Sequence, residues 1–522
     1  MRKQSGSKVY FSLIHWRNFR LKVFWEGILI GLLAGVVVVL FRYLLEQGEL
    51  LRTLLYQFFQ DGHFFLGGIW FFVLLVIACI LGWIVQREPM AAGSGIPQVK
   101  GILVGLMKMN WLQVLIHKLI GGVLAIGAGL SLGREGPSIQ LGAAVGQGIS
   151  RMLGRTKMEE RYLLTSGASA GLAAAFNAPL AGVMFSFEEL HKNFSSTVLM
   201  TTVAAAVTAD VVTQHFFGYS PVFSFAGLPV FPTGFYGWVV LLGIIMGLFG
   251  VLFNYCLLKS MDLYEKTGLS LKKKATIPLL VAGILGFLLP QVLGGGNQLV
   301  NSLSMERIGI NMISILLVVK FFFTMLSYGS GVPGGIFLPL LVLGALAGDF
   351  YGQVLVAMGF FETGYSGNFI VLAMAAYFSA IVKAPITGSI LIMEMTGSFE
   401  HMLSLIVVSM TAYVVADICK GNPIYEALLN RLLCKQGKAS FVTLPKRMVL
   451  EAAIASGAPI ERKTVKDVNW PDKALLVSIK RSEQELVPQG DTRMLAGDYL
   501  YVLVSVDKAD EIRLLAGDKI CN

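Results

Sequence analysis

The hydrophobic positions of this chain fall into long apolar runs separated by short polar breaks. Two runs near the N-terminus, Val23–Leu45 and Leu66–Val85, are long enough to cross a bilayer as helices. Further apolar runs follow at intervals: Val114–Leu132, Leu163–Asn177, Leu180–Phe187, Val198–Phe217, Phe235–Leu258, Ile277–Val292, Ile313–Tyr328, Leu340–Met358, Phe369–Val382, Ile386–Met393 and Met402–Ile418. Several are too short to span alone, and interrupted backbone at membrane depth is tolerated only where it is buried in protein or lines a cavity. The pattern predicts an all-α polytopic membrane protein with broken helices around a binding site.

Glycine-rich turns that end in proline separate some of these runs. The turn Gly133–Pro137 (GREGP) lies between two apolar stretches, which places Arg134 and Glu135 at membrane depth, where each charge costs roughly 3 kcal/mol on insertion scales. Pro137 suits the first turn of a helix, and the free N–H groups at a helix start attract an anion. We therefore expect an anion site here, with Glu135 occupying the anion's place or competing for it.

One motif of small residues and proline occurs twice. The pattern AP-x-x-G lies at 178–182 and again at 384–388, and the acids Glu188 and Glu394 follow the two copies at the same spacing. Acids at matching positions of two repeats are more typical of a structural role, so we expect both to bind backbone N–H groups rather than protons.

A second motif repeats in the same order. The pattern G-x-x-x-P lies at 133–137 and again at 335–339, at nearly the same offset as the first motif. Two ordered matches indicate an internal duplication, with halves at about 23–217 and 235–433 and the binding site at their interface.

The composition changes after the last apolar run. Residues 438–522 are polar and charged, without an apolar run of bilayer length. Leu475–Ile479 and Tyr499–Val504 alternate as strands do, and Met448–Ala455 has the character of a short helix. These features predict a small soluble α+β domain.

Composition and charge agree with a membrane protein and give its orientation. The 522 residues are 55% hydrophobic and 14% charged, and the net charge of +10 comes without a basic, aromatic-rich patch, so we expect no nucleic-acid partner. The segment 1–22 and the stretch Lys420–Arg447 are basic, so both termini are expected on the cytoplasmic side. The five cysteines are scattered, and no metal cluster, phosphate loop or nucleophile–base pair indicates an enzyme, a metal or a cofactor.

At GREGP the sequence resembles the CLC family of chloride channels and proton-coupled chloride transporters. GSGIP at 93–97, AAAFNAPLAG at 173–182, GGIFLP at 334–339 and GNPIY at 421–425 agree with that family and occur in its order, so that the resemblance covers 23–433. It implies a homodimer in the cell membrane, in which each protomer is an inverted repeat of broken, tilted helices with its own anion path. The tail 438–522 resembles the TrkA-C type of regulatory domain, which implies a small ligand, such as a nucleotide.

The resemblance also implies roles for single residues. The central chloride would be bound by two hydroxyls and two backbone N–H groups, those of Ser94, Tyr425, Ile336 and Phe337. The backbone N–H groups of Arg134 and Gly136 would form an outer anion site. Such donors hold a desolvated chloride without the full positive charge that would bind it too tightly for transport.

Two acids would carry the proton. Glu135 matches the external gating glutamate of the family, and Glu189 matches the internal proton-accepting glutamate of the exchangers. A carboxylate in a dry pathway beside an anion is driven towards its neutral form by lost hydration and by repulsion, so it can take a proton near neutral pH. The presence of Glu189 favours a chloride/proton exchanger; the alternative is a passive gated chloride channel.

Blander roles stay open for these residues. Glu135 can be a structural partner of Arg134, and Glu189 can be a solvated residue at a helix end. Ser94 can cap the helix that follows it, and Tyr425 can be a residue of the interfacial aromatic belt.

Overall fold

A computed structural model of the chain describes residues 5–61, 67–192, 195–223, 225, 227–305, 308–437, 447–482, 484–505 and 508–517. Two compact units are present: a membrane unit, Met1–Leu429, and a tail unit, Asn430–Asn522. The basic segment 1–22 lies partly outside the described residues, as does the predicted start of the tail at 438.

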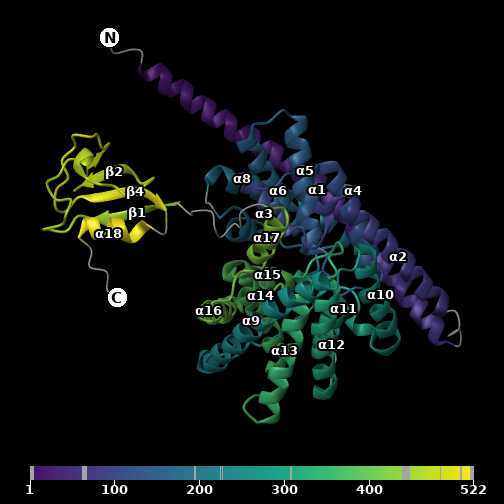
Figure 1. Cartoon of the computed structure of the whole chain (residues 1–522). Helices are drawn as coiled ribbons and strands as arrows, with labels where there is room; N and C mark the ends of the chain where they lie inside the picture. The colour runs from purple at the N-terminus through teal and green to yellow at the C-terminus, as the bar shows by residue number, and fades with distance from the viewer. Residues whose placement is uncertain are drawn as a thin grey trace. The chain divides into compact units, whose positions relative to one another are not determined.

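The membrane unit is helical, as the apolar runs predict (Figure 1). Its first half contains α1 (Ser5–Gln60), α2 (Gly67–Arg87), α3 (Ile96–Leu103), α4 (Trp111–Gly127), α5 (Glu135–Met152), α6 (Lys157–Phe176), α7 (Pro179–Phe185) and α8 (Ser196–Phe217). Its second half contains α9 (Tyr236–Lys266), α10 (Leu271–Leu288), α11 (Asn297–Met305), α12 (Ile310–Gly329), α13 (Phe337–Ala357), α14 (Ser366–Val382), α15 (Pro385–Thr396) and α16 (Met402–Ile418), and α17 (Ile424–Lys435) follows.

The two halves have the same packing partners. In the first half α5 packs on α6 and α1 packs on α8; in the second half α13 packs on α14 and α9 packs on α16. The breaks recur as well: Asn177 ends α6 and Lys383 ends α14, both in the left-handed conformation, and a proline then starts α7 and α15. The repeated AP motif therefore marks the same helix break in both halves.

Acids from each half cap a helix of the other half. The Glu394 carboxylate accepts hydrogen bonds from the N–H groups of Leu180 (3.0 Å) and Ala181 (2.7 Å) at the start of α7. The Glu188 carboxylate accepts from Ile386 and from Thr387 (2.7 Å) at the start of α15. The expectation that these two acids bind backbone N–H groups is confirmed. Each half caps a helix of the other in the same way, as a two-fold relation between the halves would produce.

Six helices in the described part of the chain are long and apolar enough to cross a membrane. They are Leu21–Gln60, Gly67–Arg87, Ser196–Phe217, Thr233–Lys266, Ile310–Gly329 and Phe337–Ala357. The first continues well beyond the predicted Val23–Leu45 to Gln60, because residues 46–60 are rich in Leu, Glu and Gln, which are good helix formers.

The tail unit is a four-stranded antiparallel sheet with a helix. Its strands, β1 (Arg447–Ala453), β2 (Leu475–Arg481), β3 (Gln484–Leu486) and β4 (Tyr499–Ser505), are ordered β1-β4-β2-β3, and α18 (Ala509–Ala516) follows. The strands predicted at Leu475–Ile479 and Tyr499–Val504 are confirmed. The predicted helix at Met448–Ala455 is wrong: burial alternates along β1 with a period of two, so pairing with β4 overrides the local helix preference.

Candidate functional site

Three glycine-rich loops meet inside the membrane unit. Gly133 and Gly335, equivalent residues of the repeated G-x-x-x-P motif, form an antiparallel bridge in which each N–H donates to the other's carbonyl, at 2.7 and 2.8 Å. Gly93 joins them, since its N–H donates to Val332 and its carbonyl accepts from Gly334. The bridge brings the starts of α5 and α13, which follow these loops, close together.

Glu135 is placed at a helix start. Its side chain is fully buried, and one carboxylate oxygen accepts a hydrogen bond from the Leu338 N–H (3.2 Å) in the first turn of α13. The other oxygen has no hydrogen-bond partner among the described residues. A helix start of this kind favours negative charge, so the carboxylate sits where an anion would bind.

The Arg134 side chain contacts a different acid. Its guanidinium lies 3.8 Å from the Glu46 carboxylate, and among the described residues no ion pair joins it to Glu135. The carboxylate can approach the Leu338 N–H because residue 133 is a glycine: a Cβ there would collide with the Glu135 carboxylate and with the Leu338 backbone. The structure thus gives Glu135 a backbone donor in place of a salt bridge.

The two hydroxyls expected at the central chloride are buried and unpaired. Ser94 and Tyr425 are almost completely enclosed, and neither hydroxyl has a hydrogen-bond partner in the part of the chain that the structure describes. Ser94 lies against Gly136, where a Cβ would collide with its hydroxyl. Buried hydroxyls are normally paired, so each of these two keeps a donor that an anion could accept.

Aromatic rings connect Tyr425 to the start of α13. The Phe185 ring lies between Tyr425 (6.4 Å between centroids) and Phe337 (6.1 Å). Ile336 and Phe337 are fully buried where α13 begins, so their N–H groups belong to the unsatisfied donors of a helix start. The structure places Ile336, Phe337 and Glu135 at one helix start, and Ser94 and Gly136 beside each other.

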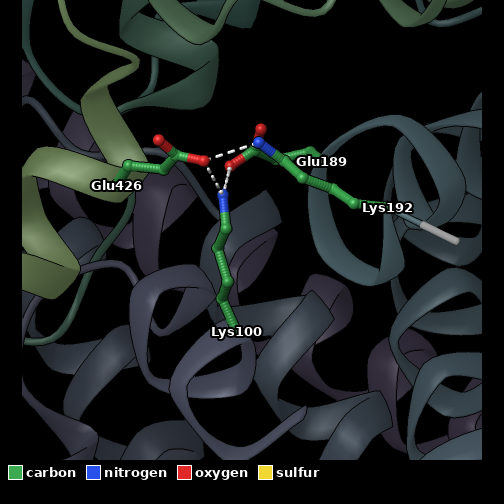
Figure 2. Close-up of polar contacts among 4 residues, drawn as sticks. All are labelled: Lys100, Glu189, Lys192 and Glu426. Atoms are coloured by element: carbon green, nitrogen blue, oxygen red, sulfur yellow. Dashed lines mark hydrogen bonds and ion pairs between the residues drawn. The ribbon is translucent and has the colours of Figure 1, made fainter. Parts of the chain in front are cut away.

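Glu189 is buried and is not solvated. It belongs to the π-helix Ser186–His191, its side chain is 2% exposed, and it forms an ion pair of 2.7 Å with Lys100 on α3 (Figure 2). The alternative of a solvated helix-end residue is therefore wrong. Sequence reasoning missed Lys100; the signal was a single charge in the apolar segment Ile96–Leu103.

Two further buried lysines were also missed. Lys118 on α4 donates to the Gly93 carbonyl (2.5 Å), and Lys320 on α12 donates to the Gly294 carbonyl (2.8 Å). Each lysine also reaches one other carbonyl of the same loop. The two lysines are 202 residues apart, the offset of the repeated glycine motif, and Lys118 fixes the loop that carries Ser94.

Comparison with known proteins gives the family. Residues 73–417, more than half of the chain, match the profile of the voltage gated chloride channel family. This chain belongs to that family. Residues 449–517 match the TrkA-C domain, in agreement with the resemblance noted for the tail.

Relatives agree over most of the membrane unit. The chain is 37% identical over 425 residues to the H(+)/Cl(-) exchange transporter ClcA of Vibrio cholerae serotype O1 (strain M66-2), which covers 79% of this chain and 90% of that protein. It is 33% identical over 425 residues to ClcA of Klebsiella pneumoniae, covering 80% and 90%.

Solved structures share the fold. A slow cyanobacterial Cl-/H+ antiporter matches with a TM-score of 0.77 and 30% identity, over 80% of this chain and 99% of that one. A eukaryotic CLC transporter matches with a TM-score of 0.68 and 24% identity, over 79% and 74%, which shows the fold alone. The predicted helical CLC fold with a small sheet domain is confirmed, and this voltage gated chloride channel family member is a multi-pass membrane protein.

Proposed function

We propose that this protein is a secondary active transporter that exchanges chloride for protons. The observation that carries the proposal is the Glu135 carboxylate, which accepts the Leu338 N–H at the start of α13, a position that suits an anion. A carboxylate can leave that position when it takes a proton, because the neutral acid no longer gains from the helix start. Exchange relatives at 33–37% identity support the same function.

The chloride is bound by neutral donors in this proposal. The hydroxyls of Ser94 and Tyr425, together with the N–H groups of Ile336 and Phe337, hold it at the central position. The unpaired, buried state of both hydroxyls supports this assignment. The N–H groups of Arg134 and Gly136 hold a second anion at the outer position, which Glu135 occupies when it is charged.

Protons use two acids. Glu189 takes a proton from the cytoplasmic side and Glu135 exchanges one with the other side. The burial of both carboxylates supports these roles, since an acid inside a membrane protein is costly and typically marks an ion or proton pathway. Glu188 and Glu394 are excluded from this task because backbone N–H groups hold their carboxylates.

Simultaneous flux measurement tests the proposal. The full chain is reconstituted in liposomes with a chloride gradient, and chloride and proton movement are recorded together. We expect chloride efflux to drive uphill proton movement, and Glu135→Ala to abolish proton movement while chloride still flows. Chloride flux without proton movement in the wild type would identify a passive gated channel and refute exchange.

The proposal includes a cell-membrane location with both termini in the cytoplasm. Basic residues at 1–22 and the TrkA-C domain at 449–517 support this orientation. Reporter fusions to the two ends test it: a periplasmic reporter that is active at either end would overturn the orientation.

We also propose a homodimer and a ligand-binding tail. Exposed apolar side chains on α15 and α16, such as Ile386 and Leu403, offer a surface for a second copy within the membrane. Single-molecule photobleaching in liposomes tests the dimer.

The tail is proposed to bind a small ligand such as a nucleotide and to bias transport. The flux of the full chain and of a variant ending at Lys435, each with and without candidate nucleotides, tests the tail: equal responses in both would refute regulation.

A further inference from the structure

Four charged side chains form one chain of ion pairs beside the internal acid. Lys100 lies 2.7 Å from Glu189 and 3.3 Å from Glu426, and Lys192 lies 2.5 Å from the same Glu426 oxygen (Figure 2). Exposure rises along this chain, from 1–2% for Lys100 and Glu189 to 15% for Glu426 and 46% for Lys192. The charges therefore connect a buried acid to the surface of the membrane unit.

The charge balance of this cluster depends on Glu189. With two acids and two lysines the net charge is zero, and Lys100 is shared between both acids. When Glu189 takes a proton, the cluster gains one positive charge, and the buried Lys100 ammonium keeps only its longer ion pair, the one to Glu426, which is unfavourable for a buried cation. Glu426 is then the charged acid in contact with Lys100, and it also pairs with Lys192, so we expect the Lys100 ammonium to move closer to it.

Lys100 and Glu426 both lie close in sequence to the proposed chloride ligands. Lys100 lies on α3, the helix that begins two residues after Ser94. Glu426 directly follows Tyr425 on α17. A movement of the ammonium from Glu189 to Glu426 therefore acts on the two segments that carry the unpaired hydroxyls.

We propose that Lys100 is a positioning residue that couples the proton step to the chloride site. Its ammonium pairs with Glu189 while that acid is charged, and it passes to Glu426 when Glu189 takes a proton from cytoplasmic water. It returns when the proton leaves. The covalent change is limited to the proton: an O–H bond forms on Glu189 as one O–H bond of a hydronium ion in the cytoplasmic water breaks, and the reverse occurs on release. Lys192 holds Glu426 in place throughout. This inference deepens the proposed exchange and rests on it for the role of Glu189.

A structure of the Glu189→Gln variant tests the movement directly, because glutamine has the shape of the neutral acid. We expect the order of the two distances to reverse, so that the Lys100 Nζ lies closer to Glu426 than to residue 189. An ammonium that stays on residue 189 overturns the proposal. This outcome does not depend on whether the wild type moves protons, so it is separate from the test of exchange.

Flux measurements test the consequence. Glu426→Gln should slow proton movement about tenfold, the effect of one lost charge-assisted hydrogen bond, while chloride flux changes less than about twofold. Glu426→Asp should restore most of the proton movement. A purely structural role would lower both fluxes together, and that result overturns the proposal.

Asp417→Asn is the matched control. Asp417 pairs with Lys383 at 2.6 Å elsewhere in the membrane unit, so the variant removes one acid from an ion pair without touching the cluster. Its proton-to-chloride ratio should equal that of the wild type. A ratio that falls as far in Asp417→Asn as in Glu426→Gln would show a general charge effect and overturn the assignment of Lys100.

Discussion

Replacing Glu135 by glutamine separates its charge from its shape. The carboxylate accepts one N–H at 3.2 Å at the start of α13. Such a charge-assisted bond contributes about 1.5–3 kcal/mol, a neutral one about 0.5–1.5 kcal/mol, and the helix start adds about 0.3–1 kcal/mol for an anion. The amide of Glu135→Gln should therefore hold this position less tightly by about 1–3 kcal/mol.

That difference sets the expected change in chloride binding. At 1.4 kcal/mol per tenfold change, chloride should compete for the outer position about 5- to 150-fold more effectively in Glu135→Gln. Proton movement should stop, because the amide of Glu135→Gln does not take up a proton near neutral pH. Calorimetric titration with chloride and paired flux recordings measure the two effects.

Two results would refute this reasoning. Uphill proton movement by Glu135→Gln would show that another group carries the proton, and unchanged chloride affinity would show that the carboxylate does not compete with the anion. Asp417→Asn is the control here too, because it removes one acid from the Lys383–Asp417 ion pair and neither residue is assigned to the chloride or proton path. It should keep the wild-type ratio of protons to chloride.

Three further outcomes are expected. Gly133→Ala adds a methyl group against the Glu135 carboxylate and fixed backbone, which should cost about 1–3 kcal/mol and lower the unfolding temperature in detergent; an unchanged temperature would show that the loop yields. Glu394→Ala removes two carboxylate–amide hydrogen bonds and should cost about 2–4 kcal/mol, measured by chemical unfolding; a loss under 1 kcal/mol would contradict the cap. In the tail, burial raises the pKa of Asp498, but hydrogen bonds from Arg481 and from a backbone N–H outweigh it and hold the pKa below the ordinary 3.8. This acid therefore contributes stability at neutral pH that is lost as the pH falls below about 3.8, and Asp498→Asn should reduce amide-exchange protection of β4 in the full chain at pH 7.

Local chemistry made the site loops predictable. The glycines and prolines of 133–137 and 335–339 specify tight turns and helix starts whatever surrounds them, and the equal spacing of Glu188 and Glu394 revealed their paired role. Charges between apolar runs pointed to Glu135. These signals lie within a few residues of one another, so a single sequence carries them.

Contacts between distant segments were not predictable in the same way. Lys100 reads as an ordinary basic residue until α3, the π-helix and α17 are brought together around Glu189. The strand β1 contains good helix formers. Its alternation of an exposed Val449 with a buried Leu450 specifies a strand only once β4 is there to pair with it. Tertiary pairing outweighs local preference in both cases.

The exchanged acid caps have a consequence for the order of synthesis. The start of α7 is capped by Glu394, 214 residues further along the chain than Leu180. At ribosomal rates of about 5–20 residues per second, roughly 10–40 s separate the appearance of these residues. During that interval the N–H groups at the start of α7 lack the Glu394 cap, so the first half reaches its final form only after most of the second half has been synthesised.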